Sequence, residues 1–320
     1  MDELRAACAA VAHRASHVTI NTDAIPAYAT TLARVASTSH PEPDASAGPP
    51  ATETEREARA AYWLTMDAIN FGSGWFPTLR KRGGLSGYNT IAAALRDRFD
   101  QHGGWSAAQL TQLDAAVLGP ILGQDPGHEL MALYAFSLRD LGQRIGADHD
   151  GNFAAVAFEA HGSAVALARR LGTWTSFQDT SRYEDLDIPF LKRAQIAAAD
   201  LHRAGVTHFT DLGALTMFAD NLVPHVLRLD GILGFDPDLV ARIDRGELIV
   251  HGSPEEVEIR ACAVQAVELL VAASPVAASP APAPTTAAPT AAALDQVLWQ
   301  RGQEPRYKAS PRHRSRCTAY

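Results

Sequence analysis

The sequence predicts a mostly α-helical fold, and three observations support this. Alanine-rich stretches with Leu and Val at helical spacing recur along the chain. Patterns that start helices precede several of these stretches, whereas strand patterns are few. The 320 residues, 47% of them hydrophobic and 20% charged, are enough to bury a large core. We therefore expect a multi-helix globular domain with a few short strands.

The expected elements begin with a short strand at 18–20, which a helix follows. A second short strand is expected at 247–250. The last of the long helices opens at Ser253, in a capping box with proline at the first helical position, and reaches about Val271. Between these, helices are expected at 54–70, 88–100, 106–118, 128–146, 152–171, 190–204, 223–234 and 237–245.

Two segments are too low in complexity to form a packed core. Residues 39–52 are rich in Pro, Ala and Ser and are expected to form a flexible loop. Residues 274–293 are mostly Ala, Pro and Thr and are expected to form a disordered tether, because they cannot bury enough apolar surface to offset ordering. The chain beyond the tether is expected to return to the core, so we expect one domain over 1–320.

Composition excludes several classes of function. The net charge of −8 argues against a general binder of nucleic-acid backbones, which presents a basic face. No apolar run reaches the length of a membrane span, and the charged N-terminus lacks the apolar core of a signal peptide. Cys8, Cys262 and Cys317 have neither disulfide nor metal-site spacing. We expect a cytoplasmic protein that uses no metal or other cofactor.

Several segments carry polar and aromatic residues in a recognisable order. They are 18–21, 63–71 with Trp75, 86–88, 153–163, 192–224, 246–247 with 256–262, and 313–320. Together they resemble the queuosine salvage proteins, which are queuosine 5'-phosphate N-glycosylases/hydrolases. The resemblance covers most of the chain. Asn221, which stands where the family commonly has an aromatic residue, is one departure.

The resemblance implies a fold similar to that of the helix-hairpin-helix DNA glycosylases. It also implies hydrolysis of the N-glycosidic bond of queuosine 5'-monophosphate, which releases queuine for tRNA modification. Two alternatives stay open: an N-glycosylase of nucleic acids or other nucleosides, and a non-catalytic protein that binds a modified nucleoside. The expected partner is a small molecule, the monophosphate or queuosine itself. Neither nucleic acid nor membrane is expected, and a monomer is favoured.

Lys192 and Asp220 are the catalytic residues that the resemblance implies. Taken alone, Lys192 fits a solvated helix face. Asp220, ahead of Asn221 and Pro224, fits a helix cap. In the catalytic interpretation, Asp220 stabilises an oxocarbenium-like sugar and accepts a proton from the attacking water. Lys192 keeps Asp220 ionised and orients the water or the departing base.

A pocket for the base is expected from aromatic and polar side chains. The aromatic rings would stack on a flat base, and the polar groups would bond its edge or the cationic amine on queuine's side arm. The alternative is a helix end with ordinary core aromatics. The candidate residues are Asp67, Asn70, Phe71, Trp75, Glu159 and Phe218.

The tail at 311–320 is basic within an acidic protein. A charged chain end is usually frayed. The resemblance instead implies that the tail docks, and that His313, Arg314 or Arg316 meets the 5'-phosphate through charge-assisted hydrogen bonds.

We expect activity to survive the removal of divalent metal ions. The 12 histidines are scattered, and no cluster of His, Cys and carboxylate residues shows ligand spacing. Queuine release should be as fast after treatment with EDTA as before it. Loss of activity on chelation, restored by one divalent ion, would contradict this mechanism.

Overall fold

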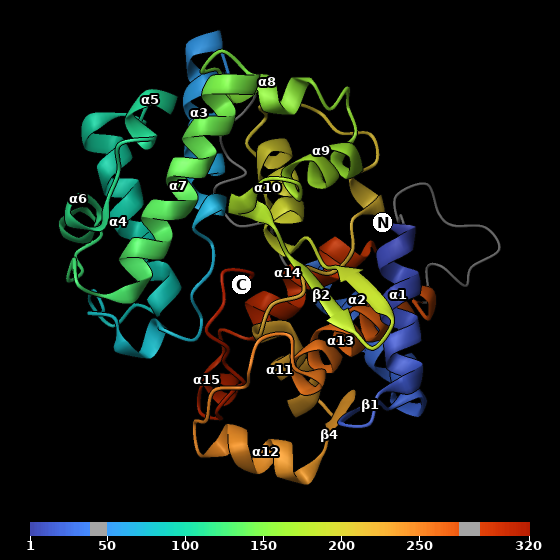
Figure 1. Ribbon diagram of the computed structural model, residues 1–320. Coiled ribbons are helices and arrows are strands. Elements are labelled where there is room, and N and C mark those ends of the chain that lie inside the picture. Colours follow the sequence, from blue (N-terminus) through green and yellow to red (C-terminus); the bar gives the residue numbers. More distant parts are fainter. Residues whose placement is uncertain (39–49, 275–288) are drawn as a thin grey trace. The chain divides into compact units, whose positions relative to one another are not determined.

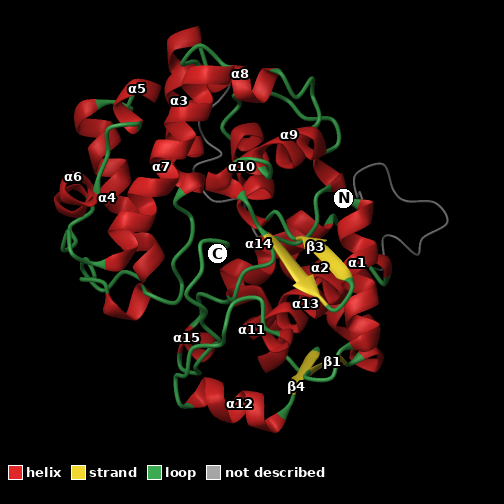
Figure 2. Cartoon of the chain, viewed as in Figure 1, coloured by secondary structure: helices red, strands yellow, loops and turns green. Residues whose placement is uncertain are grey.

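The computed structural model describes residues 1–38, 50–274 and 289–320. Most of the loop expected at 39–52 and of the tether expected at 274–293 lies outside the described residues. The described chain is mostly helical, with four short strands (Figures 1 and 2), which confirms the predicted mostly α class. None of its described helices is long and apolar enough to cross a membrane.

The chain divides into two compact units, each assembled from segments that are distant in sequence. Unit 1 comprises Met1–Pro41, Thr180–Phe190 and Gly213–Arg316, and unit 2 comprises Glu42–Asp179, Leu191–Leu212 and Cys317–Tyr320.

Unit 1 is organised around helix α13 (Pro254–Ala272), which Ser253 caps as predicted. α13 contacts α1, α2, α11 and α14 as well as three strands (Figure 1). Its buried residues occupy every face, which is typical of a helix at the centre of a core. The other elements of unit 1 are α1 (Asp2–Arg14), β1 (Val18–Ile20), η1 (Thr22–Ala24), α2 (Ile25–Thr38), β2 (Thr180–Tyr183), β3 (Leu186–Pro189), α11 (Leu222–Leu229), β4 (Leu233–Phe235), α12 (Pro237–Asp244), α14 (Ala291–Arg301) and α15 (Pro305–Lys308).

The strands of unit 1 form two antiparallel pairs. The predicted strand β1 pairs with β4, with Val18 opposite Phe235. β2 pairs with β3 as a hairpin. Neither this hairpin nor β4 was predicted. β4 begins where the helix expected at 223–234 should have continued, because α11 ends at Leu229 and Gly231 has a positive φ of 78°.

The strand expected at 247–250 is wrong. In the described part of the chain these residues pair with no strand. Instead, Ile249 N donates a hydrogen bond to Arg314 O at 2.9 Å. The apolar run 248–250 therefore belongs to an irregular segment that contacts the C-terminal tail.

Unit 2 has α3, α7 and α10 at its centre. α3 contacts α7, α8 and α10, and α10 also packs against α9. The elements of unit 2 are α3 (Glu53–Ala68), η3 (Phe76–Thr78), α4 (Gly87–His102), α5 (Ala107–Leu110), α6 (Ala115–Ile121), α7 (Glu129–Asp148), α8 (Phe153–Phe158), α9 (Ala164–Leu171), η4 (Thr175–Phe177) and α10 (Lys192–Arg203). A short 3-10 turn, η5 (Leu212–Ala214), lies where the chain passes into unit 1.

Two helices predicted as continuous are each divided in the structure. The stretch 106–118 forms α5 and α6, because the side chain of Asp114 accepts a hydrogen bond from Val117 N and starts a new helix. The stretch 152–171 forms α8 and α9, because Gly162 has a φ of 79° and Ser163 caps α9. The apolar periodicity continues across both breaks, so it could not reveal them.

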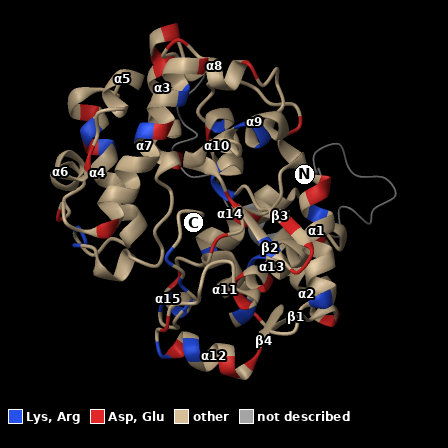
Figure 3. Cartoon of the chain, viewed as in Figure 1, with Lys and Arg blue, Asp and Glu red and all other residues tan. Residues whose placement is uncertain are grey.

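Charged residues of both signs are interspersed along the helices of each unit (Figure 3). This distribution agrees with the acidic composition.

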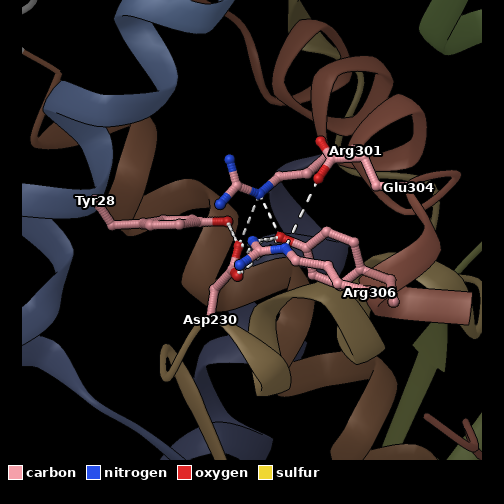
Figure 4. A network of polar contacts seen from close by, with 6 residues as sticks. Tyr28, Asp230, Arg301, Glu304 and Arg306 are labelled. Carbon is pink, nitrogen blue, oxygen red and sulfur yellow. Dashed lines mark hydrogen bonds and ion pairs between the residues drawn. The ribbon is translucent and has the colours of Figure 1, made fainter. Parts of the chain in front are cut away.

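A polar network ties together several elements of unit 1 at Asp230, the residue that ends α11 (Figure 4). The side chain of Asp230 is 5% exposed. It accepts hydrogen bonds from the hydroxyl groups of Tyr28 and Tyr307, and it pairs with Arg301 at 2.9 Å and Arg306 at 2.7 Å. One carboxylate thus connects α2, α11, α14 and α15.

We expect Asp230→Asn to lower the free energy of unfolding by about 1–3 kcal/mol. The change removes the carboxylate that pairs with Arg301 and the nearer of the two carboxylates that pair with Arg306, and the partial exposure of these arginines limits the cost. Urea unfolding of the variant measures it. Glu304→Gln is the matched control, because its pair with Arg306, at 3.7 Å, is exposed on both sides and should contribute well under about 1 kcal/mol. An equal effect of both changes would contradict this assignment.

Candidate active site

Lys192 is the first residue of α10 in unit 2, and its position is fixed by the turn before it. Leu191 has a left-handed backbone with φ 52°, a conformation that costs a branched residue free energy. Asp179 holds this turn: its main-chain oxygen accepts from Leu191 N, and its carboxylate accepts from Lys192 N at 2.9 Å. Strain of this kind persists only where the surroundings determine the conformation.

The side chain of Lys192 is buried, so the solvated interpretation of this lysine is wrong. Its ammonium group donates to Asn70 O at 2.9 Å and to Asn70 Oδ1 at 3.2 Å. Asn70 follows the C-terminal end of α3, where a cation is favoured by the helix dipole. Unit 2 thus brings together two of the predicted site residues.

Asp67 lies on the last turn of α3 and is 1% exposed. Burial raises the pKa of this carboxyl group well above its usual range, and the nearby Asp200 raises it further. Lys192 and Asn70 act in the opposite direction. Within the described residues, Asp67 Oδ2 has no hydrogen-bond partner. A third predicted residue is therefore a buried carboxyl group whose pKa is raised.

Phe71 and Trp75 are both buried in unit 2. The ring of Phe71 makes an edge contact with Tyr134, at 5.0 Å between centroids, and the Arg193 guanidinium lies 5.0 Å from its centroid. Trp75 Nε1 donates to Glu129 at 2.7 Å. These contacts are those of core aromatics. Stacking of either ring on a base stays a prediction.

Arg193 is a buried cation that sequence reasoning missed. Its guanidinium donates to Ala68 O, at 2.8 Å, and to Ser176 O. Burial lowers the pKa of Arg193 to about 10, and the charge of Asp179 opposes the shift. Arg193, the residue after Lys192, therefore fixes the main chain of Ala68, two residues before Asn70.

Glu159 is half-exposed and already has partners. Its carboxylate contacts His149 Nδ1 at 2.9 Å and Arg170 at 3.1 Å. It is not part of the group formed by Asp67, Asn70 and Lys192 in any contact that the structure records. Its role as a partner of an amine stays a prediction.

Asp220 lies in unit 1, and its carboxylate caps α11. Asp220 Oδ1 accepts hydrogen bonds from Leu222 N at 2.8 Å and Val223 N at 3.0 Å. The capping interpretation is thus confirmed, and it is compatible with catalysis because the cap holds the carboxylate rigidly at the positive end of the helix. Lys192 and Asp220 belong to different units, so their joint action stays a prediction.

The segment before Asp220 is held by buried polar side chains of unit 1. Phe218 N donates to Asp295 Oδ1, and Arg260 Nε donates to Ala219 O, each at 3.0 Å. Arg260 is itself paired with Glu256 at 3.8 Å, and both side chains are fully buried. Although burial alone would raise the pKa of Glu256, its basic neighbours lower it to about 2.

The C-terminal tail docks, so the frayed alternative is wrong. In unit 1, His313 O accepts from Asn221 Nδ2 at 3.0 Å, and Arg314 donates to Gly246 O at 3.0 Å. Burial lowers the pKa of His313 to about 3, so its imidazole is neutral and brings no charge to a phosphate. Arg316 is exposed. In unit 2, Tyr320 O accepts from Gly72 N at 3.0 Å.

Two cavities in unit 2 lie away from these residues. One, of about 580 Å³, is lined by residues that include Arg56, Phe158 and His202. The other, of about 430 Å³, includes Tyr62 and Arg96. Neither lining includes Asp67, Asn70, Lys192 or Asp220. Among the described residues, no group of three or more His, Cys, Asp or Glu is placed to hold a metal ion.

Fixed acidic and basic side chains, buried in a mostly helical chain, define a class of protein equipped for acid–base chemistry. The sequence profile of the family described as queuosine salvage protein matches residues 50–320, and this chain belongs to that family.

Curated relatives that match this chain carry the name queuosine 5'-phosphate N-glycosylase/hydrolase. The protein from Sphaerobacter thermophilus is 35% identical over 277 residues, which is 83% of this chain and 82% of the relative. The protein from Dictyostelium discoideum is 26% identical over 83% of this chain and 80% of its own length. The match with the Bos taurus protein, 34% identical, spans 45% of this chain and 44% of that protein.

We expect Asp67→Asn to stabilise the protein increasingly as pH rises. A carboxyl group whose pKa is raised by folding binds its proton more tightly in the folded state. Stability therefore falls as pH rises from the unfolded pKa, about 3.9, towards the folded one. The amide of the variant does not titrate, so the stability of the variant does not fall for this reason. Urea unfolding of both proteins between about pH 4.5 and pH 8 measures it, and a difference that does not change with pH would contradict the assignment.

Proposed function

We propose that this protein hydrolyses the N-glycosidic bond of queuosine 5'-monophosphate and releases queuine. The observation that carries the proposal is the 35% identity with the Sphaerobacter thermophilus N-glycosylase/hydrolase over more than four fifths of both chains. Asp220 supports it, because a carboxylate held at a helix N-terminus suits a reaction in which positive charge develops on a sugar.

Asp220 is the proposed catalytic carboxylate. As the glycosidic bond breaks, it stabilises the oxocarbenium-like ribose and takes a proton from the attacking water. Its two hydrogen bonds from the start of α11 use Oδ1 alone. Oδ2 has no hydrogen bond recorded to it within the described residues, and it is the oxygen we assign to the substrate side.

Lys192 and Asn70 are proposed to act on the departing base. Queuine is a 7-deazaguanine and lacks N7, so its departure cannot be speeded by protonation there. Hydrogen bonds to the leaving group must supply that stabilisation instead. A buried ammonium group that is positioned by Asn70 can donate such a bond or orient water. We propose in addition that Lys192 keeps Asp220 ionised.

Asp67 is proposed to receive the secondary amine on the side arm of queuine. The amine is cationic at neutral pH, and a buried carboxyl group without a partner for Oδ2 gains a counter-ion when it binds. The cost of keeping Asp67 buried in the free protein is then offset in the complex.

Several further features form part of this proposal. We infer a fold related to that of the helix-hairpin-helix DNA glycosylases, with both units acting as one functional domain over 1–320. The protein acts as a monomer in the cytoplasm on a small molecule. It binds neither nucleic acid nor membrane.

We expect Asp220→Asn to lower kcat for queuosine 5'-monophosphate by about 100- to 1000-fold. Asn caps helices as well as Asp does, so the fold should be retained and the loss should come from charge alone. Release of queuine, followed by chromatography, measures the rate. Queuosine and a queuosine-containing tRNA serve as alternative substrates.

A Lys192→Met variant and the double variant complete the test. If the two residues act together, the double variant should lose no more than either single variant. A thermally normal Asp220→Asn protein with activity within about tenfold of wild type would reduce Asp220 to a helix cap. Release of queuine from tRNA instead of the monophosphate would favour a nucleic-acid glycosylase, and binding without release would favour a non-catalytic protein.

A further inference from the structure

Arg312 lies in the docked tail, and the backbone on both sides of it is fixed against α11. Pro311 O accepts a hydrogen bond from Arg228 Nη2 at 3.0 Å. His313 O accepts one from Asn221 Nδ2, also at 3.0 Å. Asn221 directly precedes α11 and Arg228 lies in the last turn of this helix. Residues 311–313 therefore run alongside this helix, at whose N-terminus Asp220 is held.

The guanidinium of Arg312 has no hydrogen bond or ion pair to any residue that the structure describes, although the residue is only partly exposed. Other arginines of unit 1 are engaged: Arg314 with Gly246 O, Arg228 with Pro311 O and Arg260 with Ala219 O. A half-buried guanidinium without partners loses hydration and gains nothing in return. A guanidinium of this kind is available to bind an anion.

The charges around Arg312 indicate where that anion would lie. Burial lowers the pKa of Arg312, the carboxylate of Asp220 opposes the shift, and Arg314 adds to it. The imidazoles of His225 and His313 also face this arginine, and burial lowers the pKa of each, to about 4 and about 3. Both imidazoles are neutral, so the positive charge near Arg312 comes from arginines. Arg228, Arg260 and Arg314 each donate to a main-chain oxygen, and Asp220 is a nearby acid.

We propose that Arg312 binds the 5'-phosphate of the substrate and sets the preference for a nucleoside monophosphate over the nucleoside. The inference rests on the proposed function. The anomeric carbon and the 5'-phosphate belong to the same ribose, so a group that binds the phosphate must lie close to the carboxylate that acts on the anomeric carbon. Arg312 meets that condition because the next residue, His313, is hydrogen-bonded through its main-chain oxygen to Asn221, the residue after Asp220. The planar fork of its guanidinium suits bidentate bonds to phosphate oxygens. The positive charge of Arg312 also offsets the repulsion between the phosphate and the carboxylate of Asp220.

This assignment differs from the one expected from the sequence. His313 is neutral and buried, Arg314 already donates to a main-chain oxygen, and Arg316 is exposed. Arg312 is the residue of this tail whose guanidinium is both partly buried and available.

The test compares Arg312→Gln with wild type on two substrates, queuosine 5'-monophosphate and queuosine. We expect kcat/KM for the monophosphate to fall on the order of 100-fold, mainly through KM, and kcat/KM for queuosine to stay within about twofold. Arg312→Lys should recover part of the loss, since it keeps the charge without the fork. Arg245→Gln, an exposed arginine of the same unit that pairs with Glu247, is the control and should leave both values unchanged.

Equal losses on both substrates would overturn the inference and make Arg312 a support for Asp220. No loss on either substrate, or a selective loss in Arg314→Gln instead, would also overturn it.

A binding measurement separates this inference from the proposed function. Calorimetry with ribose 5-phosphate needs no turnover. The wild type should bind it and thermally normal Arg312→Gln should bind it at least tenfold more weakly, even if queuine release were never seen. Equal binding by both proteins would overturn the role of Arg312 while leaving the hydrolase proposal standing.

Discussion

The buried ion pair of Arg260 and Glu256 on α13 is the interaction on which the candidate carboxylate depends. Both side chains are fully buried at the centre of unit 1. Arg260 Nε holds Ala219 O, so the residue before Asp220 is tied to the core helix. The guanidinium also lies 3.9 Å from the centroid of the Phe190 ring, which closes one of its faces. Removing one partner of such a pair leaves a buried charge and typically costs about 3–5 kcal/mol. The pair therefore couples the stability of unit 1 to the geometry of Asp220.

Unit 2 uses the same device with different residues. Arg193 is buried and binds the main-chain oxygens of Ala68 and Ser176, and no carboxylate among the described residues bonds to it directly. Lys192 binds Asn70 O. Two neighbouring cations of α10 thus hold the carbonyl groups at the C-terminal end of α3, where the helix leaves them without intrahelical partners. In both units, a buried cation fixes the main chain directly beside a candidate functional residue.

Asp67 shows the cost of such an arrangement. A buried carboxyl group with a raised pKa and an oxygen without a hydrogen bond lowers stability at neutral pH. The strained left-handed backbone of Leu191 directly precedes Lys192 in the same unit. Functional sites commonly hold groups that are unfavourable in the free protein. The polar network at Asp230, by contrast, is satisfied on every side and serves to hold helices together.

The sequence by itself determined the helical class, the strand at 18–20, the helix caps and the family motifs, because these depend on local spacing and on side chains near in the chain. It also determined which short segments to inspect, and Lys192, Asn70 and Asp67 proved to be neighbours within unit 2. Only the tertiary structure decided which of these groups are buried, since burial depends on residues distant in sequence. The breaks at Gly162 and Asp114 escaped notice because apolar periodicity runs through them. Arg312 was not predicted because the sequence does not distinguish one arginine of this tail from another. Only packing shows that Arg314 has a hydrogen-bond partner and that the guanidinium of Arg312 has none among the described residues.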